Sequence, residues 1–213
     1  MKEAVHGFRC LSWLYDNPKI CRDCGAPANN YRKEYERFYK RCKEVNMALE
    51  NFVQPDMILI EENLRLRKYD GHYETFLSGY QDPVVYQNSE GIFDESRIPD
   101  LDYMNRMCSY LSRVGELYYI EVSENGNFVT IGDVTVKPEN PPIAIWKEQY
   151  RSVGIGRKVM GTVIDRLRAL GYSKITGSTV YKWNVASQKL HASLGFVPTG
   201  EDDQEYTYEL TLA

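Results

Sequence analysis

A hairpin signal in the middle of the chain constrains its fold more than any other feature. Residues 117–122 and 128–136 are rich in β-branched and aromatic side chains, and Asn125-Gly126 lies between them. Asn-Gly is favoured in the two-residue turns whose twist matches a pair of antiparallel strands. The segment therefore predicts two adjacent antiparallel strands, and a chain of 213 residues is long enough to build them into a sheet with its own core.

Helical and extended patterns continue on both sides of this hairpin. Their order predicts a mixed α/β fold, with a mostly antiparallel central sheet flanked by helices. Residues 84–100 show neither pattern and are expected to be irregular. The expected strands outside the hairpin are 57–69, 143–146, 174–180 and 205–212, and the expected helices are 35–52, 73–80, 102–114, 156–170 and 184–194.

The beginning of the chain is predicted to be a separate helical extension. Apolar side chains recur at steps of three and four between Tyr35 and Phe52, and Pro55-Asp56 ends the pattern. Such a stripe needs a surface to pack on, so we expect an appendage on the main domain. The predicted division is residues 1–56 for this extension and residues 57–213 for the main domain.

Two cysteines in this extension have the spacing of a zinc knuckle, Cys21-Arg-Asp-Cys24. A structural zinc site needs about two more ligands. The nearby candidates are His6, Cys10 and Cys42, and they do not form a second knuckle. Free thiols are therefore the favoured interpretation, and no metal is expected.

Composition excludes several classes of partner. The 26 Lys and Arg against 30 Asp and Glu give a net charge of −4, and no basic run indicates nucleic acid. No stretch reaches the ~18 apolar residues of a membrane span, and residues 1–8 lack the apolar core of a signal peptide. Five cysteines, an odd number, do not form a disulfide framework. We therefore expect a cytoplasmic, reduced protein, and its oligomeric state stays open, with a homodimer as one option.

A glycine-containing turn between a strand and a helix is the strongest chemical motif. Gly154 and Gly156 leave the backbone open at a helix N-terminus, which is suited to a pyrophosphate. A P-loop would need Lys-Ser/Thr directly after Gly156, where Arg157-Lys158 stands, and a dinucleotide fingerprint would need a third glycine three residues on. The pattern Arg/Gln-x-x-Gly-x-Gly/Ala is matched from Arg151 onward. The alternative is a glycine turn that only begins an ordinary helix.

A second motif follows on the helix predicted over 184–194. Asn184, Ser187 and His191 are spaced to share one helix face, and a helix with such a polar stripe can point it into a cleft. The alternative is a polar face in contact with solvent. The face expected to pack on the sheet carries Ala186, Leu190 and Leu194.

Together these motifs resemble the GNAT superfamily of acetyl-CoA-dependent N-acetyltransferases. The resemblance covers about residues 57–213, is sharpest over 143–196, and implies a GNAT-like central sheet. The residues at 64–67 and Tyr80-Gln-Asp-Pro also resemble the members near the bacterial ribosomal-protein N-terminal acetyltransferases. The family's order and spacing are met by Tyr150-Arg-Ser-Val-Gly-Ile-Gly, Gly171-Tyr172, Asn184-x-x-Ser187 and Leu194-Gly195-Phe196.

The resemblance implies acetyl-CoA as cosubstrate. Backbone N–H groups of residues 153–156 and of the helix that follows would hold its pyrophosphate. The strand 143–146 would pair with the pantetheine arm, and one of its N–H groups would stabilise negative charge on the thioester oxygen. The residues expected at the cofactor are Ile143, Ile145, Trp146, Arg151, Val153, Gly154, Ile155, Gly156, Arg157, Lys158, Asn184 and Ser187.

The catalytic side chains depart from the family pattern. His191 stands where many members have a proton-donating Tyr, so it is a candidate acid or base, or else a residue that contacts cofactor or solvent. Thr179 stands where some members have a catalytic Glu. Asp133 and Glu121 are candidate replacements, or else ordinary strand carboxylates.

The resemblance predicts an N-acetyltransferase that acts on a primary amine, either a protein N-terminus or a small amine such as an aminoglycoside. Because the catalytic side chains depart from the family pattern, the alternative is a non-catalytic acyl-CoA-binding sensor or interaction module. A zinc-linked adaptor built on residues 1–56 is a third interpretation.

Overall fold

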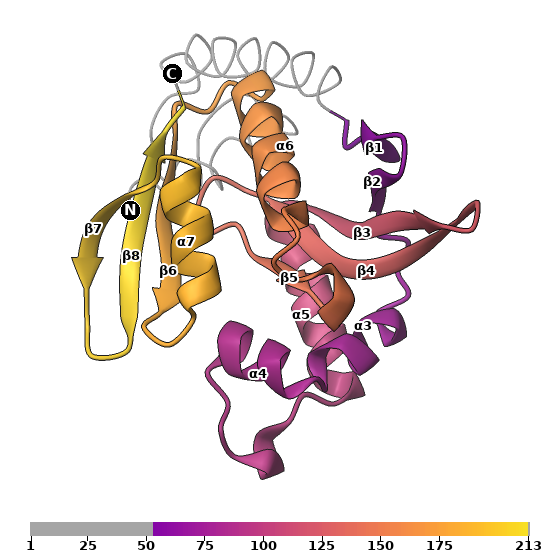
Figure 1. The fold of residues 1–213 in the computed structure, drawn as a ribbon, viewed down its shortest axis with the longest axis horizontal. Helices are drawn as coiled ribbons and strands as arrows, with labels where there is room; N and C mark the ends of the chain where they lie inside the picture. The colour runs from indigo at the N-terminus through magenta and orange to yellow at the C-terminus, as the bar shows by residue number, and fades with distance from the viewer. Residues whose placement is uncertain (1–52, 213) are drawn as a thin grey trace, which may run out of the picture. The chain divides into compact units, whose positions relative to one another are not determined.

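The computed structural model describes residues 53–212 (Figure 1). The predicted helix over 35–52 and the cysteine knuckle lie outside these residues. The described elements are β1 (Met57–Glu61), β2 (Leu64–Lys68), α3 (Glu74–Tyr80), α4 (Pro83–Glu90), α5 (Leu101–Val114), β3 (Glu116–Glu124), β4 (Asn127–Val136), β5 (Ile143–Ile145), α6 (Ile155–Ala169), β6 (Lys174–Tyr181), α7 (Val185–Ser193), β7 (Val197–Glu201) and β8 (Glu205–Thr211).

The strands form two antiparallel sheets, one with the order β1-β2-β3-β4-β5 and one with the order β6-β8-β7. This confirms the expected mixed α/β class with antiparallel sheets flanked by helices. The predicted hairpin is β3–β4, and both of its turn residues have positive φ, 51° at Asn125 and 82° at Gly126. Asn-Gly is favoured in this turn because both of its central residues need positive φ.

The two sheets meet at one place and diverge from it. A parallel bridge joins Glu139 to Thr176, where the N–H of Asn140 donates to the Thr176 carbonyl oxygen at 2.9 Å. Among residues 53–212, β5 pairs only with β4 and β6 pairs only with β8. The facing edges of β5 and β6 are therefore free of strand partners in the described part of the chain.

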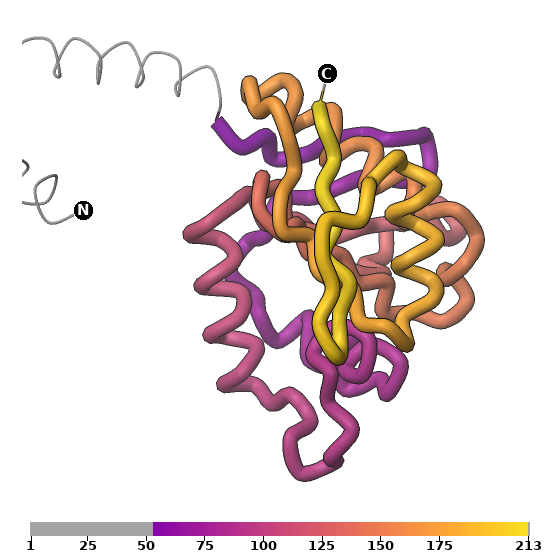
Figure 2. Tube along the Cα trace, turned by 90° about the vertical axis from the view of Figure 1, so that its left-hand side faces the viewer, coloured from indigo at the N-terminus to yellow at the C-terminus, as the bar shows by residue number. Residues whose placement is uncertain are grey.

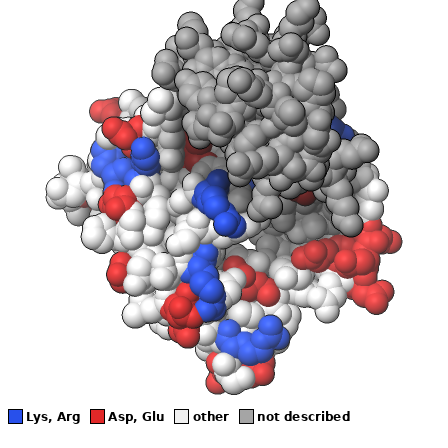
Figure 3. All heavy atoms as spheres, turned by 180° about the vertical axis from the view of Figure 1, so that it is seen from behind, with Lys and Arg blue, Asp and Glu red and all other residues white. Residues whose placement is uncertain are grey.

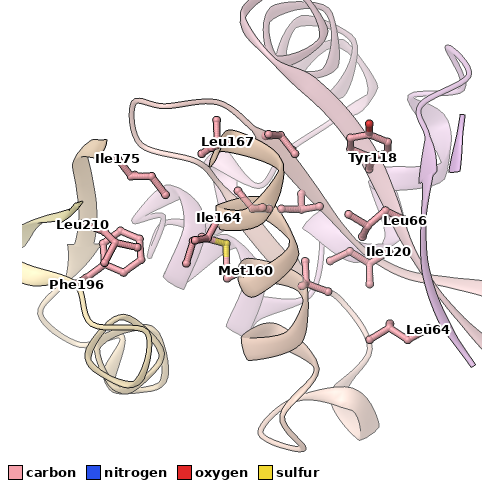
Figure 4. Close-up of a cluster of buried hydrophobic side chains, with 14 of the residues drawn as sticks. Leu64, Leu66, Tyr118, Ile120, Met160, Ile164, Leu167, Ile175, Phe196 and Leu210 are labelled. Carbon is pink, nitrogen blue, oxygen red and sulfur yellow. The ribbon is translucent and has the colours of Figure 1, made fainter. Parts of the chain in front are cut away.

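Helices cover both faces of the larger sheet (Figures 1 and 2). Alternate residues of β3 point to opposite faces, as the pleat requires. Tyr118 and Ile120 belong to the core beneath α6, whereas Leu117 and Tyr119 belong to the core beneath α3 and α5. Figure 4 shows Met160, Ile164 and Leu167 of α6 between the side chains of the larger sheet and those of the smaller one. Because α6 packs on both sheets, it fixes the separation of β5 and β6.

Three elements differ from the sequence prediction. The strand predicted over 57–69 is two strands, because the chain turns at Glu62-Asn63. The stretch predicted to be irregular contains α4, which begins at Pro83 with Asp82 as its N-cap. The edge strand β7 was not predicted, because its Val-Pro-Thr-Gly-Glu sequence carries proline and glycine and all five residues are exposed.

Charges of both signs share the surface. On the described part of the face in Figure 3, Lys and Arg lie beside Asp and Glu and do not form one continuous basic area. No helix within residues 53–212 is long and apolar enough to cross a membrane.

Candidate active site

The N-terminus of α6 is open to a ligand. Its N-cap is Gly154, which has φ 91° and no side chain to cap the first-turn N–H groups. A Cβ added at Gly154 would meet nothing within 4 Å, and Val153 is exposed. Uncapped N–H groups and the helix dipole together favour an anion at this position. The sequence placed the glycine turn and the helix start correctly.

Of the three predicted cations around this turn, two have partners in the protein. The Arg151 guanidinium donates from Nε to the Ile145 carbonyl oxygen at 2.9 Å and forms an ion pair with Asp82 at 3.1 Å. Lys158 forms an ion pair with Glu61 at 2.8 Å. Arg157 is exposed and has no ion pair within the described residues. Arg151 therefore anchors the turn to β5 and α4, and Arg157 is the cation left for a phosphate.

The outer edge of β5 presents backbone donors to the gap between the sheets. The N–H of Trp146 donates to the Ile131 carbonyl oxygen at 2.7 Å, and the Pro142 carbonyl oxygen accepts from Thr135 N–H at 3.1 Å. Because an antiparallel ladder alternates, the N–H groups of Ile143 and Ile145 point the other way. These two predicted residues thus lie where an extended ligand can add to the strand.

Trp146 is the packing anchor at the end of this edge. Its indole Nε1 donates to Asp133 Oδ1 at 2.8 Å, and the Tyr80 hydroxyl lies 3.2 Å from the same oxygen. A Cβ on Gly79 of α3 would lie 2.3 Å from the Trp146 ring, so only glycine allows this contact. The role of Gly79 was not predicted from the sequence, although a glycine inside a helix is a signal of close packing.

The two candidate carboxylates occupy different surroundings. Asp133 is fully buried, and this burial raises its pKa from the ordinary 3.8 to about 7, against the opposing hydrogen bonds from Trp146 and Tyr80. Glu121 is buried between two guanidinium groups, Arg65 Nε at 2.8 Å and Arg67 Nε at 2.6 Å. Each Glu121 oxygen has its own charged donor, which favours a structural role.

Asn184 and Ser187 organise the start of α7. Asn184 is its N-cap, and the side-chain Oδ1 accepts from Ser187 N–H at 3.0 Å. Asn184 Nδ2 donates to the Asn88 carbonyl oxygen at 3.4 Å. The Asn184 side chain therefore serves as a helix cap in the structure. The contact of Asn184 and Ser187 with the cofactor remains a prediction.

Leu190 of α7 and Leu194 at its C-cap pack against the core, as expected, but the polar stripe is not placed as expected at His191. His191 does not point into a cleft, because it packs against Phe196 and Tyr208 with ring centroids at 4.7 and 5.1 Å. Its Nδ1 lies 2.8 Å from the Ser187 carbonyl oxygen and its Nε2 lies 2.8 Å from Ser178 Oγ. The amphipathic pattern of the helix is weak, and the small Ala186, expected to pack on the sheet, is exposed.

Comparison with known proteins decides the family. The model of the acetyltransferase (GNAT) family matches residues 84–196, more than half of the chain. The chain belongs to this family. It is therefore an acyltransferase, and acetyl-CoA is the cosubstrate of the family's reaction. A search of curated proteins finds no matching sequence.

Solved structures share the fold of this acetyltransferase. YncA from Salmonella typhimurium, solved with its cofactor acetyl-CoA, is 22% identical, with a TM-score of 0.52 over 71% of this chain and 95% of that one. The ribosomal-protein-S5-alanine acetyltransferase of Vibrio fischeri is 15% identical, with a TM-score of 0.54 over 71% and 94%. The spermidine N-acetyltransferase of Vibrio cholerae, solved with CoA and spermine, is 16% identical, with a TM-score of 0.54 over 71% and 97%. At these identities the likeness concerns the fold alone.

The described residues of the acetyltransferase fit its cosubstrate. The uncapped N-terminus of α6 suits a pyrophosphate, and Gly154 leaves space beside it. The free N–H groups of Ile143 and Ile145 suit an extended amide-containing arm. Both features border the gap between β5 and β6, as Figure 1 shows.

Replacing Asp133 with asparagine is expected to make the acetyltransferase's stability less sensitive to pH. The pKa of Asp133 is higher in the folded protein than in the unfolded chain, so the folded state holds this proton more tightly. The stability that this contributes is fully present below about pH 4 and is lost as the pH rises through 7. Relative to wild type, Asp133→Asn should therefore gain roughly 2 kcal/mol in free energy of unfolding between pH 5 and pH 8. Urea unfolding of both proteins at the two pH values measures this, and an equal difference at both would contradict the buried carboxyl.

Proposed function

We propose that this acetyltransferase transfers the acetyl group of acetyl-CoA to a primary amine, either a protein N-terminus or a small amine. The observation that carries the proposal is the uncapped N-terminus of α6 beside the free edge of β5. The two features together match a ligand with a pyrophosphate at one end and an extended arm at the other. We also propose that residues 57–213 are the acetyltransferase domain and that residues 1–56 are an extension of it.

Backbone groups account for most of the proposed cosubstrate site. The N–H groups of residues 153–156 would hold the pyrophosphate, with Arg157 as the nearby cation. The edge of β5 would pair with the pantetheine arm, and Ile143 or Ile145 would donate to the thioester oxygen. A positioned N–H group stabilises negative charge there when the amine nitrogen attacks the carbonyl carbon.

The acceptor is not selected by the fold. The neighbours of this fold include one protein named for an alanine of a ribosomal protein and one named for spermidine, so the fold alone does not select one class of acceptor. The class of amine therefore depends on this chain's own side chains at the mouth of the gap.

The first test of the proposal is cosubstrate binding. We expect CoA or acetyl-CoA to raise the melting temperature, because a ligand at about 100 times its Kd adds roughly 2.7 kcal/mol of stability. Differential scanning fluorimetry with each nucleotide checks this, and an unchanged melting temperature at millimolar CoA would contradict it. Thiol release from acetyl-CoA is then measured with a panel of peptides and small amines. Binding without thiol release for any amine would favour the non-catalytic acyl-CoA module.

A further inference from the structure

Glu90, the last residue of α4, is a half-buried carboxylate without a cationic partner among the described residues. It accepts a hydrogen bond from the Tyr103 hydroxyl of α5. Burial raises the pKa of Glu90, and the Tyr103 hydrogen bond lowers it in opposition. A carboxylate removed from water in this way is stabilised by any positive charge that reaches it.

Aromatic rings line the approach to this carboxylate. Tyr181 stacks on Trp183 with a centroid distance of 4.4 Å and an interplanar angle of 11°, and Phe93 meets Trp183 edge-on at 5.1 Å. Trp183 and Phe93 are exposed. A Cβ on Gly91 would lie 2.7 Å from the Tyr181 hydroxyl, so the Tyr181 ring abuts the backbone directly after Glu90. Exposed aromatic faces beside a carboxylate favour an ammonium group.

Two hydrogen bonds tie the end of α4 to the loop between β6 and α7. Trp183 Nε1 donates to the Gln87 carbonyl oxygen at 3.1 Å, and Asn184 Nδ2 donates to the Asn88 carbonyl oxygen. Figure 1 shows α4 beside this loop, at the end of β6 where α7 begins. Glu90 therefore lies near the end of β6, the strand whose free edge borders the proposed cosubstrate site.

Within the described part of the chain, the groups that interact with Glu90 are neutral or negative. Burial raises the pKa of Tyr103, Tyr80 and Tyr181, with Glu90 as a further cause in each. Glu90 also contributes to the raised pKa of Asp133 on β4. Arg106 interacts with Tyr103 from the exposed side of α5, where it is paired with Asp102. Among residues 53–212, no cation therefore pairs with the Glu90 carboxylate, and a cationic ligand would supply that charge.

We propose that Glu90 binds a protonated amine of the acceptor, beside the stacked rings of Tyr181 and Trp183, and so selects cationic acceptors. This inference rests on the proposed function and names the residue that recognises its second substrate. A carboxylate–ammonium hydrogen bond contributes more than a neutral one, so its loss is measurable in KM.

Steady-state kinetics of Glu90→Gln with 1,4-diaminobutane and with butylamine tests the proposal. We expect KM to rise about tenfold or more with kcat little changed, because a hydrogen bond to a charged group is lost. If Glu90 binds the nitrogen that is not acetylated, KM rises for the diamine alone. If Glu90 binds the nitrogen that is acetylated, KM rises for both amines. Glu95, an exposed glutamate that begins the short 3-10 helix Glu95–Arg97 after α4, provides the matched control, and Glu95→Gln should leave both KM values unchanged.

A second variant gives a readout that a structural role would not move. Tyr103→Phe removes the hydrogen bond that lowers the pKa of Glu90. Glu90 is then protonated at a higher pH than in wild type. The acidic limb of the kcat/KM profile for 1,4-diaminobutane should therefore shift to higher pH. An unshifted profile contradicts the proposal.

The inference and the proposed function fail in different ways. Wild type that binds no CoA, or that releases no thiol with any amine, overturns the proposed function. The assignment of Glu90 is overturned when active wild-type enzyme and Glu90→Gln share the same KM for both amines. It is also overturned when calorimetry detects no binding of 1,4-diaminobutane to the wild-type enzyme with CoA.

Discussion

Replacing Gly156 with valine is expected to lower the affinity for CoA by roughly 100-fold or more, because two charge-assisted hydrogen bonds of at least ~1.5 kcal/mol each would be lost. Gly156 lies in the first turn of α6, where its branched replacement would stand over the backbone N–H groups that we assign to the pyrophosphate. A Cβ at this position meets only Leu190 Cδ2 at 3.6 Å, an ordinary contact, so the fold tolerates the change. Isothermal titration with CoA measures the loss.

Gly161 provides the matched control on the same helix. A Cβ at Gly161 meets nothing within 4 Å, so Gly161→Val makes the same chemical change farther along α6 and should leave CoA affinity unchanged. Gly154 is a poorer test, because its φ of 91° makes any side chain strained and lowers stability as well. Full CoA affinity in a folded Gly156→Val protein would show that this turn does not hold the phosphates.

Local signals explain why the glycine turn was predictable from sequence. The turn, the helix after it and the hairpin before it are each specified by residues adjacent in the chain. Gly154 supplies the left-handed backbone that begins α6, and Asn125-Gly126 supplies the hairpin turn. Turns of this kind can be predicted from sequence because their backbone conformation depends on the turn residues themselves and agrees with the rest of the fold.

Tertiary contacts explain what could not be predicted. Arg151 was expected at the phosphates, but its guanidinium is used by Ile145 and by Asp82, and Asp82 lies 69 positions away in the sequence. Glu90 gave no sequence signal, because its role depends on Tyr103 and Tyr181 from two other elements. Side-chain partners across the fold are not encoded in the spacing of one motif.

His191 shows the same limit most clearly. Helical spacing predicts that His191 belongs to a polar stripe of α7, but it does not predict whether that stripe faces the core or a cleft. With Nδ1 directed at the Ser187 carbonyl oxygen, the ring carries its proton on Nδ1 and accepts from the Ser178 hydroxyl at Nε2. Burial lowers the pKa of His191, which favours this neutral form. A neutral ring whose two nitrogens both have partners is suited to holding α7 on β6 more than to protonating a thiolate.

We therefore expect His191→Ala to lower the free energy of unfolding by about 3 kcal/mol, from the cavity left beside Phe196 and Tyr208 and from the unpaired Ser178 hydroxyl. Ser178→Ala added to His191→Ala should recover part of the loss, since it removes the buried hydroxyl. Because the folded pKa lies below the ordinary 6.5, wild type loses stability as pH falls through about 6.5, and the variant should lack this dependence. Urea unfolding between pH 5 and pH 8 measures all three effects.

Turnover decides between this structural role and the proton transfer that the family resemblance suggests. At a temperature where His191→Ala is folded and saturated with acetyl-CoA, we expect kcat to fall less than about tenfold, below the usual contribution of a general acid or base. A fall of about 100-fold with stability and CoA affinity intact would instead assign the proton transfer to His191. In that case the ring has to leave Ser178 during the reaction, and Ser178→Ala should change the pH profile of kcat.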